Sequence, residues 1–339
     1  MACPFGGATH EVSDSSPKCP LGYDTASFKL GPLSCLVCRA LLFKAARCLP
    51  CRHVFCSACI ARFSDCPLCG VDISGLEEDG ELQKLVDQFI QGHARVRRQQ
   101  QQQQQEEGPV VYEDASLARG SFLLQHAMRA FQAQNLESSK ARLDLCVEDT
   151  REMMETKGAS AEVCSQHGAV LGLLGDCLRA MGDLDGAMDK YAESVSVLQA
   201  ITGVDVNAEI VHALSVSLNK LGDLKYYADD LECALALYKQ ALQVRDRAQA
   251  GRNDLSAESI DVVVSLAKVA DVQRAMGRDS EAAEGFAAAI TRMEHLTCPP
   301  SPRDESLNKR RASVLGFLHA QQQQQQQETK AKKKQAQAP

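Results

Sequence analysis

The sequence predicts a mainly α-helical protein, with a small zinc-bound module of mixed α and β structure near the N-terminus and an α-solenoid behind it. Three observations predict this fold class. Cysteine and histidine residues cluster in closely spaced pairs between positions 35 and 69. A pattern of apolar and small residues recurs every 47 to 48 residues later in the chain. Two runs of seven glutamines, 99–105 and 321–327, lie outside both patterns and mark joints.

The chain has 339 residues, which favours two folded units joined by linkers. No apolar run approaches the ~18 residues that span a bilayer, so we expect no membrane partner. The first residues lack the basic start and apolar core of a secretory signal, which favours a cytoplasmic, reducing location. A net charge of -7 argues against nucleic acid as a partner.

Composition and spacing divide the chain into segments. We expect a disordered N-terminus over 1–28, the zinc module over 29–76, an amphipathic helix over 77–98, a glutamine-rich linker over 99–112, helical repeats over 113–320 and a disordered tail over 321–339. The amphipathic helix is predicted from apolar residues at helical spacing, which are Leu82, Leu85, Val86, Phe89 and Ile90.

The repeats align three kinds of position. A large apolar residue, a small residue and an aromatic residue recur in order, as Leu171, Leu218 and Leu266, then Ala187, Ala234 and Ala282, then Tyr191, Tyr238 and Phe286. A weaker copy has Leu123, Ser139 and Leu143. The order resembles tetratricopeptide repeats, in which antiparallel helices pack through small residues, although the usual period is about 34 residues. We therefore predict a tetratricopeptide-like α-solenoid closed by a helix over 305–320. An irregular helical bundle is the alternative.

The cysteine cluster has the spacing of a metal site. Paired cysteines in a cytosolic chain indicate metal binding rather than disulfides. Eight residues can supply ligands, which is enough for two tetrahedral zinc sites: Cys35, Cys38, Cys51, His53, Cys56, Cys59, Cys66 and Cys69.

The order of these residues, with a single histidine, resembles the RING finger. That resemblance implies interleaved sites, with Cys35, Cys38, Cys56 and Cys59 on one zinc and Cys51, His53, Cys66 and Cys69 on the other. Each site then has four protein ligands and no open position, so we expect both Zn²⁺ ions to be structural. Cys48 is one cysteine too many. Choosing it as a ligand would leave the Cys51-x-His53 step unexplained.

Many RING fingers bind a ubiquitin-conjugating enzyme through an apolar patch. The matching residues here are Leu36, Val37, Phe63 and Pro67. Two departures from the RING pattern weigh against ligase activity. Gly70 follows the last cysteine, where active ligases commonly have Arg or Lys. Tryptophan, which is frequent in active ligases at the position of Phe63, is absent from the chain. A RING that serves as a docking or folding module is the competing interpretation.

No nucleophile motif, phosphate loop or catalytic carboxylate pair is present, so we expect no enzyme active site. Asp176, Asp223 and Asp271 recur at one position of successive repeats and predict an acidic column that binds a basic or polar partner. The alternative is local ion pairing with Arg179 and Arg274, three residues further on.

Segments from both predicted domains extend the resemblance. "KCPLGYDTASFKLGPLSCLVCRALLF", "HVFCSACIARFSDCPLCGVDI", "RGSFLLQHAMRAFQAQN" and "LSVSLNKLGDLKYYADDL" resemble the plant and algal "no catalase activity" family, over about residues 18 to 318. The resemblance implies a non-enzymatic chaperone whose helical repeats bind catalase and promote its activity, in support of peroxide removal and stress response. The alternative is a ubiquitin ligase whose repeats recruit substrates.

Overall fold

The computed structural model describes residues 31–91, 114–201, 208–249, 254–297 and 305–336. Contacts divide the chain into two compact units, residues 1–139 and 140–339. The predicted N-terminal tail over 1–28 and the linker over 99–112 lie outside the described residues. Among the helices described, none is long and apolar enough to cross a membrane.

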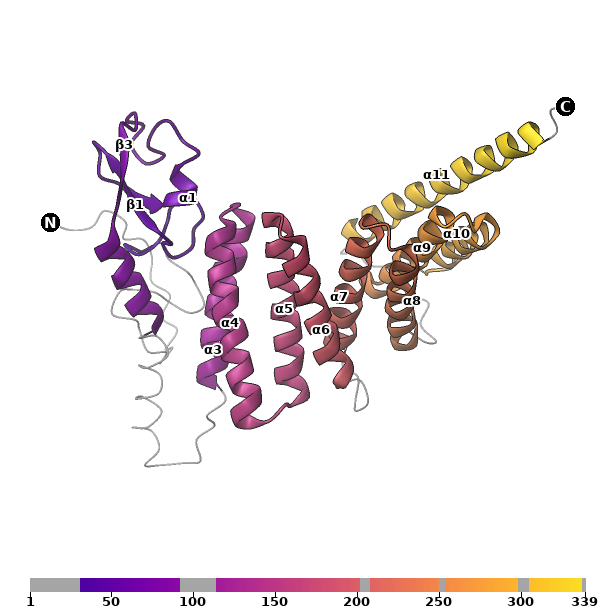
Figure 1. The fold of residues 1–339 in the computed structure, drawn as a ribbon, viewed down its shortest axis with the longest axis horizontal. Helices are drawn as coiled ribbons and strands as arrows, with labels where there is room; N and C mark the ends of the chain where they lie inside the picture. The colour runs from indigo at the N-terminus through magenta and orange to yellow at the C-terminus, as the bar shows by residue number, and fades with distance from the viewer. Residues whose placement is uncertain (1–30, 92–113, 202–207, 250–253, 298–304, 337–339) are drawn as a thin grey trace. The chain divides into compact units, whose positions relative to one another are not determined.

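The first unit contains a small antiparallel sheet with strand order β2-β1-β3 (Figure 1). β1 (Ala45–Leu49) is central and pairs with β2 (Val54–Cys56) and β3 (Gly75–Glu78), and the short helix α1 (Ser57–Ile60) follows β2 directly. The buried residues beneath this sheet are few, with Phe55 and Ile60 the largest near β2 and α1. A core this small favours additional cross-links, such as metal ions, for stability.

The predicted amphipathic helix is helical over residues 80–91, and its remainder to 98 is outside the described residues. Its predicted start at 77 is wrong, because Glu77 and Glu78 belong to β3. Asp79 stops the strand and caps the helix, since its carboxylate accepts from the Leu82 N–H at 3.1 Å. Arg47 donates to the same carboxylate and is the main cause of the lowered pKa of Asp79. On the helix, Val86 is buried but Leu85 is exposed.

Helix α3 (Asp114–Gln132) lies in the first unit, together with the zinc module. The sequence prediction placed this segment, from residue 113, in the repeat domain. Hydrogen bonds between α3 and the zinc module, described below, explain the difference. The next helix, α4 (Leu136–Lys157), begins in the first unit and continues into the second.

The second unit is built from antiparallel helical pairs that stack in chain order (Figure 1). The pairs are α5 (Ala161–Met181) with α6 (Leu184–Ala200), α7 (Ala208–Tyr227) with α8 (Leu231–Ala248), and α9 (Ala257–Ala275) with α10 (Asp279–Glu294). Side-chain caps begin four of these helices, from Ser160, Asp183, Asp230 and Ser256. The predicted helical repeat is therefore present in the structure.

The aligned repeat positions form the core of each pair. Ala187, Ala234 and Ala282 are fully buried, and Tyr191, Tyr238 and Phe286 are at most 4% exposed. Leu171 and Leu218 are fully buried, and Leu266 packs against the core around Phe286. Gly175 and Gly222, 47 residues apart, leave room for the rings of Tyr191 and Tyr238. The small and aromatic positions thus allow the two helices of a pair to approach closely.

Successive repeats are joined through the predicted column of aspartates. Asp176 accepts from the Tyr191 hydroxyl at 2.8 Å and from Lys220 of the next repeat. Asp223 repeats this arrangement with Tyr238 and Lys268.

The third copy differs because Phe286 has no hydroxyl. Asp271 there pairs with Arg274 at 2.5 Å, as the local ion-pair alternative predicted, whereas Asp176 pairs with Lys220 instead of Arg179. Each aspartate is thus paired with a cation, so the column is not a stripe of uncompensated negative charge.

Helix α11 (Glu305–Ala336) covers the end of the last pair. Its Leu318 is fully buried against the cluster that contains Phe286 and Met293, and Arg310 donates to Asp261 at 2.5 Å. This agrees with the predicted closing helix. The prediction of a disordered tail from residue 321 differs from the structure, in which the glutamine run continues α11. Glutamine is a good helix former, which explains the extension.

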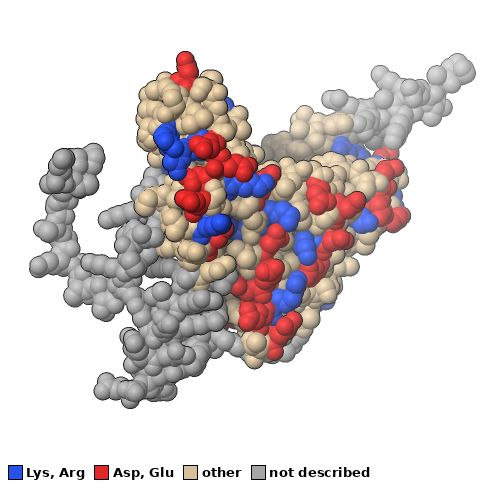
Figure 2. Space-filling view, turned by 60° about the vertical axis from the view of Figure 1, so that its left-hand side comes forward, with Lys and Arg blue, Asp and Glu red and all other residues tan. Residues whose placement is uncertain are grey.

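Charged side chains of both signs are interspersed on the face shown in Figure 2. In the second unit, ion pairs connect neighbouring helices, for example Arg278 with Glu232 at 2.9 Å and Arg292 with Asp246 at 2.6 Å. Exposed pairs of this kind contribute little stability each.

The close approach at Gly222 gives a test of the repeat packing. A Cβ at this position would lie 2.6 Å from Cε1 of Tyr238, so Gly222→Ala should lower the free energy of unfolding by about 1–3 kcal/mol. Chemical denaturation followed by circular dichroism measures this. Gly316→Ala in α11 is the control, because an added Cβ there would meet no heavy atom within 4 Å apart from the nearby backbone of its own helix. Alanine at this position should raise helix stability by up to ~1 kcal/mol. Equal effects of the two changes would contradict the packing argument.

Candidate metal centres

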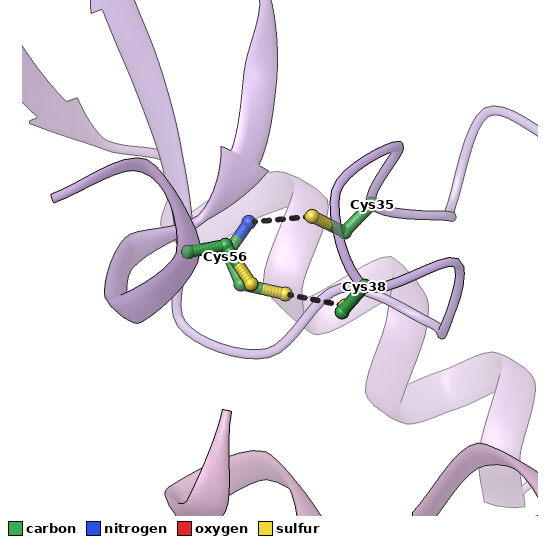
Figure 3. A group of neighbouring side chains, drawn as sticks. Cys35, Cys38 and Cys56 are labelled. Atoms are coloured by element: carbon green, nitrogen blue, oxygen red, sulfur yellow. Dashed lines mark hydrogen bonds between the residues drawn. The ribbon is translucent and has the colours of Figure 1, made fainter. Parts of the chain in front are cut away.

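The first candidate centre brings together four sulfur atoms from two parts of the chain. Cys35 and Cys38 lie on a tight turn, Cys56 ends β2 and Cys59 lies in α1, and the four Sγ atoms are within 4.8 Å of one another. Cys38 Sγ and Cys56 Sγ are 3.9 Å apart (Figure 3). Tetrahedral Zn–S bonds of about 2.3 Å require sulfur atoms about 3.8 Å apart, so this spacing fits zinc.

The second centre joins the β1–β2 turn to the turn after α1. Cys51, His53, Cys66 and Cys69 offer three sulfur atoms and one nitrogen, again within 4.8 Å of one another. His53 Nδ1 is 3.5 Å from Cys66 Sγ, so this nitrogen faces the site. The structure therefore places all eight predicted ligands in two groups, with the interleaved pairing that the RING resemblance implied.

Two turns share one backbone pattern that aims their cysteines inward. In the first, Cys35 N–H donates to Ala40 O, and Arg39 N–H donates to Cys35 O. In the second, Cys66 N–H donates to Val71 O, and Gly70 N–H donates to Cys66 O. The residue after the second cysteine has a positive φ in both, 52° at Arg39 and 69° at Gly70. The left-handed conformation explains why glycine suits position 70.

Cys35 in the first group and Cys66 in the second have a lowered pKa, whereas neighbouring sulfur atoms raise the pKa of Cys38, Cys56 and Cys69. The pKa of Cys35 is held well below its usual range because Cys38, Cys56 and Cys59 donate to its sulfur. Burial raises the pKa of Cys66, but the backbone N–H groups of Leu68 and Cys69 outweigh this effect and lower it to about 6. Thiolate is the form that binds metal. A set of soft sulfur and imidazole ligands with four members per site fits Zn²⁺ better than Mg²⁺ or Ca²⁺.

Cys48 belongs to neither group, in agreement with the sequence analysis. It is fully buried, and burial is the main cause that raises its pKa to about 11. Its turn nevertheless resembles those of the ligand pairs, because Cys48 N–H donates to His53 O and Arg52 N–H donates to Cys48 O. The thiol is thus a neutral core residue beside the second centre.

The proposed enzyme-docking residues lie at the surface. Leu36 and Phe63 are each 41% exposed, Pro67 is exposed and Val37 is half-buried. Their part in binding a ubiquitin-conjugating enzyme stays a prediction.

The sequence analysis missed His126 and Asn135, which contact the zinc module from 85 and 76 residues away in sequence. Neither has a local motif, so only the folded chain brings them to the module.

Comparisons with known proteins place the chain in a family. It is 49% identical over 325 residues to Protein NCA1 of Arabidopsis thaliana, which covers 93% of this chain and 79% of that protein. The chain belongs to the NCA1 family. Because the similarity covers 93% of this chain, it includes both the cysteine-rich module and the helical repeats of the chain.

Other similarities are narrower. The chain is 32% identical over 65 residues to E3 ubiquitin-protein ligase CHFR of Danio rerio, which covers 18% of the chain and 10% of that protein. No family model matches. Among solved structures, BtubC from P. vanneervenii matches with a TM-score of 0.45 and 15% sequence identity. The match covers 66% of this chain and 82% of the BtubC chain. The apo form of RapI matches with a TM-score of 0.45 and 11% sequence identity. This match covers 72% of this chain and 58% of the RapI chain.

Metal content tests the assignment of ligands. We expect the purified protein to hold two zinc ions, Cys51→Ser to hold one, and Cys48→Ala to keep both, because Cys48 is outside both groups. Native mass spectrometry measures the zinc stoichiometry of each protein directly. Loss of one zinc from Cys48→Ala, with normal binding by Cys51→Ser, would reverse the roles of the two cysteines.

Proposed function

We propose that this protein is a non-enzymatic chaperone that binds catalase through its helical repeats and promotes catalase folding and activity. The observation that carries the proposal is the 49% identity to NCA1 over 93% of the chain. The resemblance of both domains to the "no catalase activity" family is the reason for proposing catalase as the client protein. On this proposal the protein acts in the cytoplasm, where newly made catalase is available, and supports hydrogen peroxide removal during stress.

A groove in the second unit offers a surface for such a client. It has a volume of about 620 Å³ and lies between the end of α5, the start of α6 and the end of α7. Its lining includes Leu184 and Tyr227, which are 51% and 82% exposed, beside Lys220 and Asp223. Exposed apolar side chains next to charged ones suit a partly folded polypeptide, which presents both kinds of group.

The zinc module supports this function without taking part in chemistry. Each centre offers four side chains that could bind a metal, so a tetrahedral Zn²⁺ held by all four would leave no position for a substrate. We propose that the module has the RING fold, holds two structural Zn²⁺ ions and completes or stabilises the client surface.

Catalase activation tests the proposal. Recombinant catalase made together with this protein should decompose peroxide faster per milligram than catalase made alone, and heating should inactivate it more slowly without ATP. Residues 108 to 320 should capture catalase from a lysate. If neither capture nor a higher specific activity is observed, the chaperone proposal fails.

The groove can be tested at Tyr227. Because this side chain is 82% exposed, Tyr227→Ala should leave the melting temperature nearly unchanged and weaken catalase binding, by about tenfold if the tyrosine is an anchor. Isothermal titration calorimetry measures the affinity. Arg247→Ala, an exposed change on α8 outside the groove, is the control. Equal affinity of both variants and the unaltered protein would place the client elsewhere.

A second candidate function is ubiquitin ligation. It is favoured by the local similarity to CHFR and by exposed Leu36 and Phe63 on the zinc module. A purified system with ubiquitin, activating enzyme and conjugating enzymes should then show self-ubiquitination that Leu36→Ala and Cys51→Ser abolish. Catalase activation that survives Leu36→Ala would separate the chaperone function from any ligase activity.

A further inference from the structure

Helix α3 and the turn after it are attached to the zinc module beside its first metal centre. His126 Nδ1 accepts from the Leu41 N–H at 3.1 Å, and both residues are at most 1% exposed. Arg62, three residues after Cys59, donates to Ala133 O at 2.9 Å. Leu41 and Arg62 each lie three residues after a cysteine of the first centre, Cys38 and Cys59, so the helix is held against that side of the module.

Asn135 makes the most direct of these connections. The residue is fully buried, and its Nδ2 donates to Sγ of Cys59 at 3.3 Å. At the other end of the same amide, Oδ1 accepts from the Ser138 N–H at 3.3 Å and so caps the start of α4. The opposite orientation would place nitrogen against an N–H group and oxygen against a sulfur anion. The two partners therefore fix the direction of the amide.

A centre of four thiolates needs such donors. Four thiolates around one divalent cation leave an excess of negative charge, which N–H groups aimed at the sulfur atoms stabilise. The module itself supplies two, from Phe43 N–H to Cys56 Sγ at 3.3 Å and from Cys56 N–H to Cys35 Sγ at 3.4 Å. Asn135 supplies another to a third ligand, and it comes from outside the module.

We propose that Asn135 is a positioning residue for the first metal centre, whose hydrogen bond to the Cys59 thiolate links metal binding at that centre to docking of α3 and the start of α4. Because coupling is reciprocal, the docked helix raises metal affinity at this centre by the same factor by which the bound metal favours docking. The second centre, with its three sulfur atoms and one nitrogen, is not part of this link.

The dual role of the amide allows its two functions to be separated. Asn135→Asp keeps an oxygen that can cap α4 but loses the N–H donor, and Asn135→Ser does the same without adding charge. Asp230→Ala is the matched control, because it removes a helix cap in the second unit, where Asp230 Oδ1 accepts from the Cys233 N–H at 3.4 Å at the start of α8.

The experiment uses the full chain loaded with ¹¹³Cd, whose two sites give separate resonances because their ligand sets differ. In the unaltered protein we expect a scalar coupling between the Asn135 side-chain amide protons and the cadmium of the four-sulfur site, transmitted through the N–H···S bond. In Asn135→Asp and Asn135→Ser we expect this coupling to be lost and the ¹¹³Cd resonance of the four-sulfur site to move. We also expect that site to lose its metal to a chelator at about tenfold lower chelator concentration than in the unaltered protein. Amide hydrogen exchange over residues 122–139 becomes faster.

The second centre is the internal reference in every variant. Its resonance and chelator resistance should stay as in the unaltered protein, and Asp230→Ala should change neither site. Absence of the coupling in the unaltered protein would overturn the proposal, as would equal weakening of both centres in the Asn135 variants. Both results can be read from metal signals alone, so they are independent of catalase activation.

Discussion

The convergence of four sulfur atoms in the first metal centre is the constraint on which the first unit depends. Cys35 and Cys38 come from a turn before the sheet, whereas Cys56 and Cys59 come from β2 and α1. The sheet has three short strands and few large buried side chains, so its burial of apolar area is small. A metal ion held by these sulfur atoms would supply the missing cross-links, and one held by the interleaved second group would connect the turns that the first leaves apart.

The second unit is stabilised by a different means. Its cohesion comes from a repeated contact in which an aspartate accepts from the tyrosine of its own helical pair and the lysine of the next pair, as in Asp176, Tyr191 and Lys220. Burial is the main cause that raises the pKa of Tyr191, so its hydroxyl remains a donor over the physiological range. The same contact recurs at Asp223 with Tyr238 and Lys268, and Lys220 and Asp223 line the groove that contains Tyr227.

Both units fit the interaction role proposed for this protein, because each has exposed apolar side chains: Leu36 and Phe63 in the first unit, and Leu184 and Tyr227 in the second. The similarity to Protein NCA1 of Arabidopsis thaliana covers 93% of the chain and so includes both units. Within the first unit, the amide of Asn135 contacts both Cys59 of the first centre and the start of α4, the helix that continues into the second unit.

The sequence by itself determined the local patterns: eight candidate metal ligands at fixed spacing, a 47- to 48-residue repeat with its small and aromatic positions, and a closing helix. These follow from periodicity and residue chemistry, which are readable within a window of tens of residues. Only the tertiary structure decided that α3 belongs with the zinc module, that Lys220 rather than Arg179 pairs with Asp176, and that Asn135 reaches Cys59. Those contacts include hydrogen bonds between residues from 44 to 85 positions apart. Many side chains could satisfy one buried thiolate or carboxylate, so the packing of whole helices selects the partner.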